Sequence, residues 1–429
     1  MTKFQLIFIG ILILTIFTGV IIFATSKLGG SDSLSPVTLW GTMSALEFNG
    51  YLEKIKFATG ESPRITYVEK SRASFDRELI EAIASNKGPD MILLPHDLIM
   101  RFADKVVPIP YSTFSERTFK DTFVEEGELF LSPTGALALP FTIDPLVMYW
   151  NRDVFSSASL ALPPKLWGEF ADLAVTLTEK DTRLNITKSA LAFGEFTNIV
   201  NAKEILSALI FGAGNPITSR GPEGIRTVLS DKLGATLFPA QVALDFYTQF
   251  SNPAKTVYSW NRALPSSKNF FTSGDLAIYI GFASELSDIY RKNQNLNFDV
   301  APLPQARDAR VKTTYGTMQG IAILRTSPYI ADAYSVAGIL VSSENLALFS
   351  EVTGLPPVLR DLLANKPTNP IQVVFYNAAL QARGWLDPEP MKTSAIFKDM
   401  IESLSSGRLK TSEAVRKAHS EIELLFTPS

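Results

Sequence analysis

Short apolar runs alternate with longer stretches of helical periodicity in the first folded part of the chain. In chain order the predicted elements are a strand at 37–40, a helix at 45–59, a strand at 64–68, a helix at 74–85 and a strand at 90–94. This alternation is typical of βαβ units on a parallel sheet, whose ligands bind beyond the carboxyl ends of the strands. We therefore expect ligand-facing residues at 40–44 and 95–98.

The α/β pattern continues through the rest of the chain. Predicted helices lie at 164–177, 202–211, 240–250, 330–341, 344–351 and 370–383, and predicted strands at 276–280 and 320–324. The chain has 429 residues. Because single hydrophobic cores stop growing beyond about 250–300 residues, we expect two lobes.

The segment 4–24 contains no charged residue and follows Lys3. As a helix it would be about 31 Å long at roughly 1.5 Å per residue, which matches a bilayer core of roughly 30 Å. We therefore expect a transmembrane helix that anchors the protein in the cell membrane, with residues 26–36, rich in Ser and Gly, as a tether and the soluble part outside the cytoplasm. A cleaved signal peptide remains the alternative, because small residues at 24–26 suit cleavage.

Composition and charge exclude several function classes. The net charge is -3 and no basic stripe occurs, so nucleic acid is not an expected partner. Cys is absent, which excludes disulfides, thiolate metal sites and a lipid-modified cysteine. Common catalytic motifs are missing, and the two histidines, His96 and His419, are far apart in sequence. No catalytic, cofactor-binding or metal-ligating residue is therefore assigned, and the protein is not expected to be an enzyme.

Five motifs follow one another in a fixed order along the chain. They are GPDMILLPHD at 88–97, LPFTIDPLVMYWNRD at 139–153, PPKLW with a glutamate at 163–169, FTSGDLAIYIG at 271–281, and FDVAPLP at 298–304 followed by GIAI at 320–323 and GLPPVL at 354–359. In this order they resemble the family 1 extracellular solute-binding proteins of ABC importers, the group that includes maltose-binding protein. Each motif alone is weak, and the joint order carries the resemblance.

The resemblance implies an α/β, two-lobed, periplasmic-binding-protein-like fold of type II, in which connecting strands cross between the lobes more than once. Residues 1–30 would form the anchor and tether. Lobe 1 would comprise 31–143 and 316–368, and lobe 2 would comprise 144–315 and 369–429. The implied function is capture of a small solute, foremost an oligosaccharide or other sugar, and its delivery to the permease subunits of an ABC transporter.

A sugar site needs flat aromatic faces and fixed hydrogen-bonding groups around the hydroxyls. Residues of these types at the expected strand ends, crossover and turns are Trp40, Thr42, Ser44, His96, Asp97, Asp144, Tyr149, Asn198, Trp260, Phe282 and Trp385. The two late tryptophans stand in polar, turn-like surroundings, where a core role explains an aromatic less easily. Structural alternatives stay open: Trp40 could cap the core, Asp97 could cap a helix, and Asp144 could serve the hinge alone.

Two further functions stay open. The same fold could serve as a membrane-tethered ligand sensor or assembly subunit, since a helical anchor replaces the usual lipid anchor. A tethered polysaccharide-active enzyme is the remaining alternative, although a pair of carboxylates for it can be chosen only arbitrarily. Maltodextrin itself is doubtful as a ligand, because Leu94 and Ala283 stand near positions where maltose-binding protein has aromatic residues.

Overall fold

The computed structural model describes residues 35–61 and 63–426. A ten-stranded sheet runs through both lobes in the order β2-β1-β3-β13-β6-β11-β8-β7, with β12 paired to β6 and β14 to β13. Its strands are β1 (Val37–Gly41), β2 (Ile65–Glu69), β3 (Met91–Pro95), β6 (Leu139–Asn151), β7 (Glu179–Lys180), β8 (Ile186–Leu191), β11 (Leu276–Phe282), β12 (Phe298–Ala301), β13 (Thr314–Ile323) and β14 (Ala382–Arg383).

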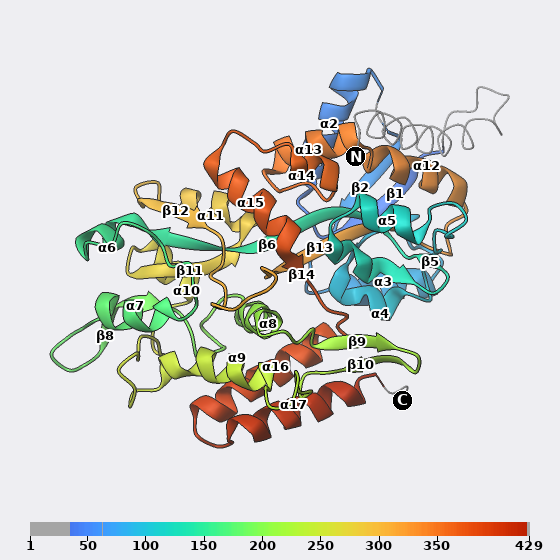
Figure 1. The fold of residues 1–429 in the computed structure, drawn as a ribbon. Coiled ribbons are helices and arrows are strands. Elements are labelled where there is room, and N and C mark those ends of the chain that lie inside the picture. The colour runs from blue at the N-terminus through green and yellow to red at the C-terminus, as the bar shows by residue number, and fades with distance from the viewer. Residues whose placement is uncertain (1–34, 62, 427–429) are drawn as a thin grey trace, which may run out of the picture.

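Helices cover the sheet on the outside of each lobe (Figure 1). In the first lobe they are α2 (Ala45–Thr59), α3 (Phe75–Ala84), α4 (Ile99–Phe102), α5 (Glu116–Thr122), α12 (Ile330–Leu340), α13 (Ser343–Thr353) and α14 (Arg360–Ala364). In the second lobe and its junction they are α6 (Arg152–Ser157), α7 (Glu169–Leu177), α8 (Ala202–Gly212), α9 (Pro239–Thr248), α10 (Ser267–Thr272), α11 (Leu286–Lys292), α15 (Pro370–Gln381), α16 (Pro390–Ser405) and α17 (Thr411–Leu424).

Short elements connect the larger ones. They are the 3-10 helices η1 (His96–Leu98), η2 (Glu125–Phe130), η3 (Gln249–Ser251) and η4 (Ala283–Glu285), and the strand pairs β4 (Leu131–Ser132) with β5 (Gly135–Ala136) and β9 (Thr218–Gly221) with β10 (Gly224–Thr227). The pair β9–β10 forms a hairpin that extends from the second lobe towards the first (Figure 1).

Strand β6 joins the two lobes. Its first half pairs with β13 through residues 139–145, and its second half pairs with β11 and β12 through residues 146–151. In Figure 1 it crosses the centre of the molecule between the lobes. The change of partner occurs next to Asp144, which therefore lies at the boundary between the lobes.

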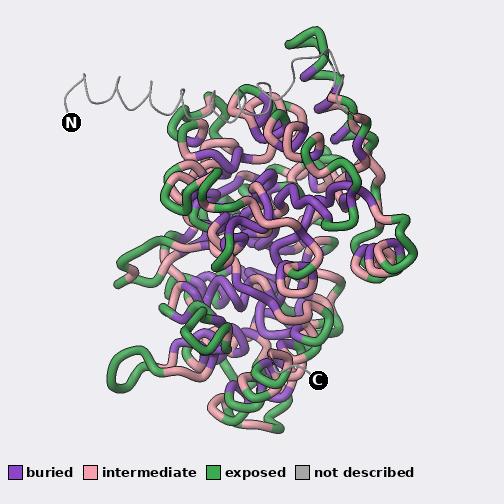
Figure 2. Tube along the Cα trace, turned by 90° about the vertical axis from the view of Figure 1, so that its right-hand side faces the viewer, coloured by how far each residue is buried: buried purple, intermediate pink, exposed green. Residues whose placement is uncertain are grey.

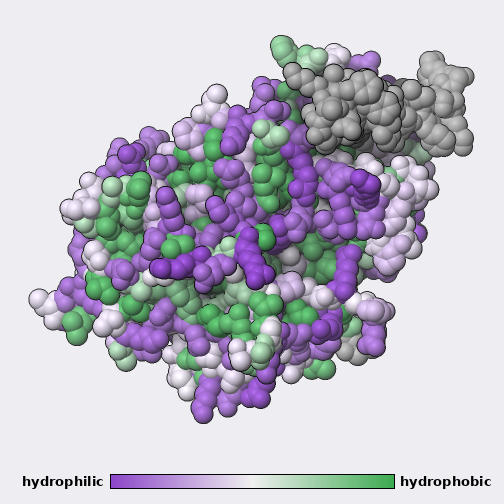
Figure 3. Space-filling model, viewed as in Figure 1, coloured by the Kyte–Doolittle hydropathy of each residue, from purple (hydrophilic) through white to green (hydrophobic). Residues whose placement is uncertain are grey.

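The buried side chains form two separate core clusters. One contains residues of 37–143 and 318–363, and the other contains residues of 146–315 and 397–422. The segment around α15 serves both, because Phe375 belongs to the second cluster and Ala379 to the first. Figure 2 shows the buried positions filling the interior, with exposed positions on the outer helices and loops. On the face shown in Figure 3, hydrophilic residues are spread over both lobes, as expected of side chains that face water.

Most predicted elements are present within a residue or two, and α2 has the predicted bounds, ending at Gly60 with a left-handed φ of 78°. Three differ. Helix α7 begins only at Glu169, because the backbone of Lys165 and Trp167 is hydrogen-bonded to Gln305 as an isolated bridge. The predicted helix at 370–383 ends at Gln381, after which β14 pairs with β13. The strand at 320–324 is the end of the longer β13, whose start is fixed by pairing across the lobe boundary.

The predicted anchor and tether at 1–30 lie outside the described residues. In the described ranges, no helix has both the length and the apolar character needed to cross a membrane.

Candidate ligand-binding site

Two residues of the first lobe follow the carboxyl end of β3, as the sequence predicts. His96 is buried, and its Nδ1 accepts the amide hydrogen of Met318 at 3.0 Å. Its Nε2 lies 3.3 Å from the hydroxyl of Tyr315. Burial lowers the pKa of His96, so the ring is neutral and Nε2 carries the proton. His96 therefore holds β13 in place beneath the lobe boundary.

Asp97 reaches the boundary next to His96. One of its carboxylate oxygens pairs with the guanidinium of Arg72, whose side chain is about half exposed. The other oxygen, Oδ1, is buried and has no hydrogen-bond partner among the described residues. Because a buried acceptor without a donor costs about 1–3 kcal/mol, a donor from a ligand would stabilise this arrangement.

The second lobe presents the start of α8 to the same region. Lys203 donates to Asp387 at 2.6 Å and to Thr393 at 2.8 Å, so its charge is neutralised within the lobe. Burial raises the pKa of Glu204, and the carboxylates of Asp97 and Asp387 raise it further against the opposing effect of Lys203. The charge of Asp97 in one lobe therefore acts on the carboxyl group of Glu204 in the other.

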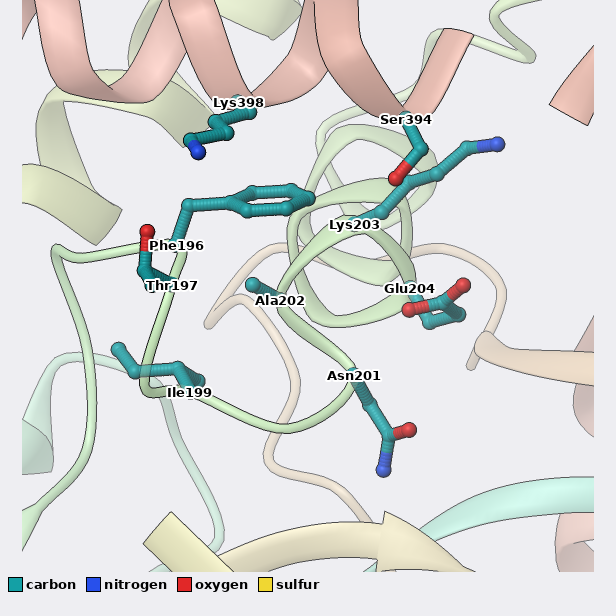
Figure 4. A pocket seen from close by; sticks show the side chains of 9 residues that line it. All are labelled: Phe196, Thr197, Ile199, Asn201, Ala202, Lys203, Glu204, Ser394 and Lys398. Carbon is teal, nitrogen blue, oxygen red and sulfur yellow. The ribbon is translucent and has the colours of Figure 1, made fainter. Parts of the chain in front are cut away.

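A pocket of about 370 Å³ opens at the start of α8. It is lined by Phe196, Thr197, Ile199, Asn201, Ala202, Lys203, Glu204, Ser394 and Lys398. Figure 4 shows the ring of Phe196 between α16 and the start of α8, with Lys398 reaching down from α16 and Glu204 on the opposite side. The volume falls within the range of about 300–1,000 Å³ that is usual for small-molecule sites.

Two of the predicted site residues, Asp144 and Tyr149, lie on the crossover strand β6. Asp144 accepts the amide hydrogen of Ser284 at 3.0 Å, and burial raises its pKa to about 7. Tyr149 is fully buried, and its hydroxyl donates to the carbonyl of Phe282 at 2.7 Å, so its polar atom already serves the turn after β11. The ring of Phe282 lies edge-on to that of Tyr315, with centroids 6.4 Å apart.

Trp40 and its neighbours line the end of β1. The indole of Trp40 is half-buried, and the Lys70 ammonium lies 3.9 Å from its ring centroid. Thr42 accepts the side-chain amide of Gln319 at 3.3 Å, which ties β1 to β13. Ser44 precedes α2 but makes no capping hydrogen bond with its side chain. A ligand that used the indole face would have to displace the lysine.

The expectation that turn-like surroundings leave Trp260 and Trp385 outside the core is wrong. Both are buried in the core cluster of the second lobe. The indole of Trp260 donates to Asn198 at 3.1 Å, and Asn198 donates to the carbonyls of Asn261 and Leu264 at 2.9 and 3.0 Å. These hydrogen bonds hold the polar loop at 260–264 against the core. Trp260, which belongs to this loop, is therefore buried. Ligand contact by these residues stays a prediction.

Several polar residues at the boundary had no clear signal in the sequence. They are Arg72, Glu126, Lys203, Glu204, Tyr315 and Asp387. Lys203 and Glu204 are the two charged residues of α8, whose other residues are mostly apolar, which could have marked Lys203 as a paired lysine. The surroundings of the other residues in this set consist of residues that are distant in the sequence, so no local pattern marks them. Within the described ranges, no group of three or more acidic or histidine side chains could hold a metal ion.

Comparison with known proteins gives consistent matches. A family model described as bacterial extracellular solute-binding protein matches residues 52–383. A binding protein of Brucella abortus (strain 2308) is 24% identical over 325 residues, which is 72% of this chain and 73% of the relative. The sn-glycerol-3-phosphate-binding periplasmic protein UgpB of Escherichia coli (strain K12) is 22% identical over 350 residues, covering 78% of this chain and 76% of UgpB.

Solved structures match over nearly the whole chain. A cyclo/maltodextrin-binding protein in complex with maltotetraose has a TM-score of 0.71 at 16% identity and covers 92% of this chain and 98% of its own. An ABC transporter solute-binding protein of Thermotoga lettingae bound with α-D-tagatose has a TM-score of 0.68 at 19% identity and covers 91% and 99%. At these identities the matches show a common two-lobed α/β fold, as the sequence predicts.

Proposed function

Because the chain belongs to the bacterial extracellular solute-binding proteins, we propose that it captures a polyhydroxylated solute, a sugar or related polyol, between its lobes and presents it to the permease subunits of an ABC importer. The observation that carries the choice of solute is Asp97 Oδ1 at the end of β3, a carboxylate oxygen that lacks a donor among the described residues. The hydroxyl group of a sugar or polyol can donate to such an oxygen.

The pocket at the start of α8, whose lining residues all belong to the second lobe, offers groups of the kinds that sugar recognition uses. Phe196 gives a flat apolar face, and Asn201 and Thr197 give polar groups beside it. Two of the matching solved structures carry maltotetraose and tagatose, which supports a sugar. The family and fold are those of binding proteins, so we propose no chemical step.

A phosphate ester, suggested by the name of UgpB, suits the charges of the site less well. Phosphate is recognised by free cationic side chains and amides. Here Arg72 is paired with Asp97 and Lys203 with Asp387, while Glu204 adds a further carboxyl group. Lys398 is a single cation at the rim. The site is therefore better suited to a neutral ligand than to an anion.

Capture would proceed by a hinge movement of the two lobes. We propose that lobe 1 comprises 31–143 and 316–368 and lobe 2 comprises 144–315 and 369–429, in accord with the two core clusters. The ligand drives closure only through its better affinity for the closed state. Residues 4–24 would anchor the protein in the membrane, with both lobes outside the cytoplasm.

A thermal-shift screen against sugars, polyols, glycerol phosphate, amino acids and anions tests the proposal. The full-length chain is purified in a non-ionic detergent without sugar headgroups. A ligand at about 100 times its Kd stabilises by roughly 2.7 kcal/mol, which is readily seen as a higher Tm.

The expected result is a shift with one sugar or polyol that Asp97→Ala abolishes. Asp104→Ala, at an exposed carboxylate paired only with Lys105, is the matched control and should keep the shift. A shift with glycerol phosphate alone would overturn the choice of solute. No shift with any compound would favour the tethered sensor or assembly subunit.

A further inference from the structure

One segment of the first lobe lies at the sheet edge where the sequence places ligand-facing residues. It comprises residues 70–74 between β2 and α3 and begins directly after β2, which is the neighbour of β1 in the sheet. Backbone hydrogen bonds fix its position, because the amide of Lys70 donates to the carbonyl of Gly41 at 2.8 Å and the amide of Ser74 to that of Ser71 at 3.1 Å. The segment is thus held at the carboxyl ends of the strands.

Two cationic side chains of this segment contact two of the predicted site residues. The Nζ of Lys70 lies 3.9 Å from the ring centroid of Trp40 at the end of β1. Arg72 pairs with Asp97, which follows β3 on the far side of β1. Aromatic faces and carboxylates are groups that bind sugars and polyols. Here the protein's own side chains engage one of each.

A second contact holds Lys70 in its place over the indole. Its Nζ lies 3.0 Å from Oε2 of Glu78 on α3, and the hydroxyl of Ser74 donates to Oε1 of the same carboxylate at 2.6 Å. The hydrogen bonds from Ser74 and Lys70 lower the pKa of Glu78, so its carboxylate stays charged. Lys70 is therefore positioned by a ring on one strand end and by a carboxylate on the following helix.

Lys70 reduces the ring surface that Trp40 can offer to a solute. The indole is partly buried and packs against the core cluster of the first lobe. Lys70, whose side chain is 20% exposed, covers ring surface that the core leaves free. An ammonium group is attracted by the negative face of an aromatic ring, so a neutral sugar ring has to displace the lysine before it can stack there.

The pair of Asp97 and Arg72 stays within reach of a solute. The Asp97 side chain is 24% exposed and that of Arg72 is 48% exposed. A guanidinium carries five N–H donors, and a carboxylate accepts several hydrogen bonds, so the pair can serve hydroxyl groups without being broken. The first lobe thus presents accessible hydrogen-bonding groups beside an aromatic ring that is covered.

We propose that Lys70 is a specificity-determining residue: it covers Trp40, so that the first lobe recognises its solute by hydrogen bonds with Asp97 and Arg72 and not by stacking of a sugar ring. This inference rests on the proposed capture of a sugar or polyol and narrows it. A flat sugar ring gains nothing from Trp40 while Lys70 is in place, whereas an acyclic polyol has no flat face to stack.

Matched pairs of solutes test the role of Lys70. Glucose and glucitol, mannose and mannitol, and galactose and galactitol share their hydroxyl configurations pairwise, but only the sugar forms a ring with a flat apolar face. Their affinities are measured by titration calorimetry on the full-length chain in the same detergent. Lys70→Ala frees the indole, so it should raise the preference for the ring over its alditol by about threefold or more, as expected for an accessible cation–aromatic contact.

Three further variants show whether the indole is responsible. Trp40→Ala combined with Lys70→Ala should remove the gain, because no ring is left for stacking. Lys70→Arg keeps a cation over the ring and should keep the native preference. Lys188→Ala is the matched control and should also keep it, because Lys188 likewise lies 3.0 Å from a glutamate, Glu179, but in the second lobe.

The outcomes separate this inference from solute capture itself. Binding of a pair with the same preference in Lys70→Ala as in the native protein would overturn the role of Lys70 and leave capture intact. A gain that persists in the double variant would also overturn it, since the lost charge and not the indole would then be responsible. Absence of heat with all six compounds, in both the native protein and Lys70→Ala, would overturn the inference together with the capture of such solutes.

Discussion

Ionisable side chains at the lobe boundary depart from their ordinary behaviour because the fold removes them from water. Burial raises the pKa of Glu126 to about 8 and that of Asp144 to about 7, and it lowers the pKa of His96. The charge of Asp144 also raises the pKa of Glu126. Glu126 and Asp144 are therefore expected to titrate near neutral pH.

The stability of the protein should fall as the pH rises from acidic to neutral. Glu126 and Asp144 have ordinary values of 4.5 and 3.8 when unfolded, so the folded state binds their protons more tightly. Their contribution is fully present below the unfolded values and is lost as the pH passes the folded values, between about 4 and 8. Glu126→Gln should reduce the fall in Tm between pH 5 and about pH 8. Calorimetry across that range is the measurement, and an unchanged slope in the variant would contradict the assignment.

The location and burial of individual residues could be predicted from their neighbours in the sequence to different degrees. Asp97 was expected beyond the carboxyl end of a buried strand, and it lies in η1 directly after β3, while its contact with ligand stays a prediction. The prediction that Trp260 lies outside the core was wrong, because polar neighbours in the sequence do not show that a loop folds back over a core. Glu126 stands among other glutamates in the sequence, and only its burial without a partner distinguishes it.

At the level of elements, one hairpin connects the lobes in addition to the crossing strands. Ile225 on β10 packs against the core cluster of the first lobe, although the hairpin belongs to the second. Arg220 on β9 donates to two backbone carbonyls of the first lobe, those of Leu129 and Leu131. Arg226, on the same hairpin, pairs instead with Asp231 of its own lobe at 3.1 Å.

Arg220→Ala should loosen the contact between the lobes. A hydrogen bond from a charged donor contributes about 1.5–3 kcal/mol, so loss of two should shift the equilibrium towards open forms and lower solute affinity by roughly tenfold or more. Small-angle X-ray scattering of the protein without solute should give a larger radius of gyration. Arg226→Ala is the control and should scatter as the native protein does. Identical scattering from both variants would show that the hairpin does not hold the lobes together.

The whole molecule combines two cores on one continuous sheet. Because β6 changes partners at Asp144, backbone hydrogen bonds of one strand link the two cores, which form separate clusters. Such a link allows the lobes to move while each keeps its core. The uncharged segment at 4–24 precedes both cores and would place them beside the transporter that they serve.

Membrane fractionation tests that placement. With the proposed anchor at 4–24, an uncharged segment of 21 residues, the full-length chain should remain with membranes after washing at alkaline pH. A chain beginning at residue 31 should appear in the soluble fraction. Recovery of the full-length product in the soluble fraction, with a mass that lacks the first residues, would establish a cleaved signal peptide instead.

The sequence by itself determined the α/β alternation and the family. Both follow from local features of the sequence: apolar residues that recur every two to four positions indicate strands and helices, and short motifs indicate the family. Only the tertiary structure decided which polar groups meet. Lys203 and Asp387 are 184 residues apart, and Arg220 and Leu129 are 91 apart. Whether such groups are paired, buried or left without a partner depends on how two lobes pack, and no local pattern encodes that.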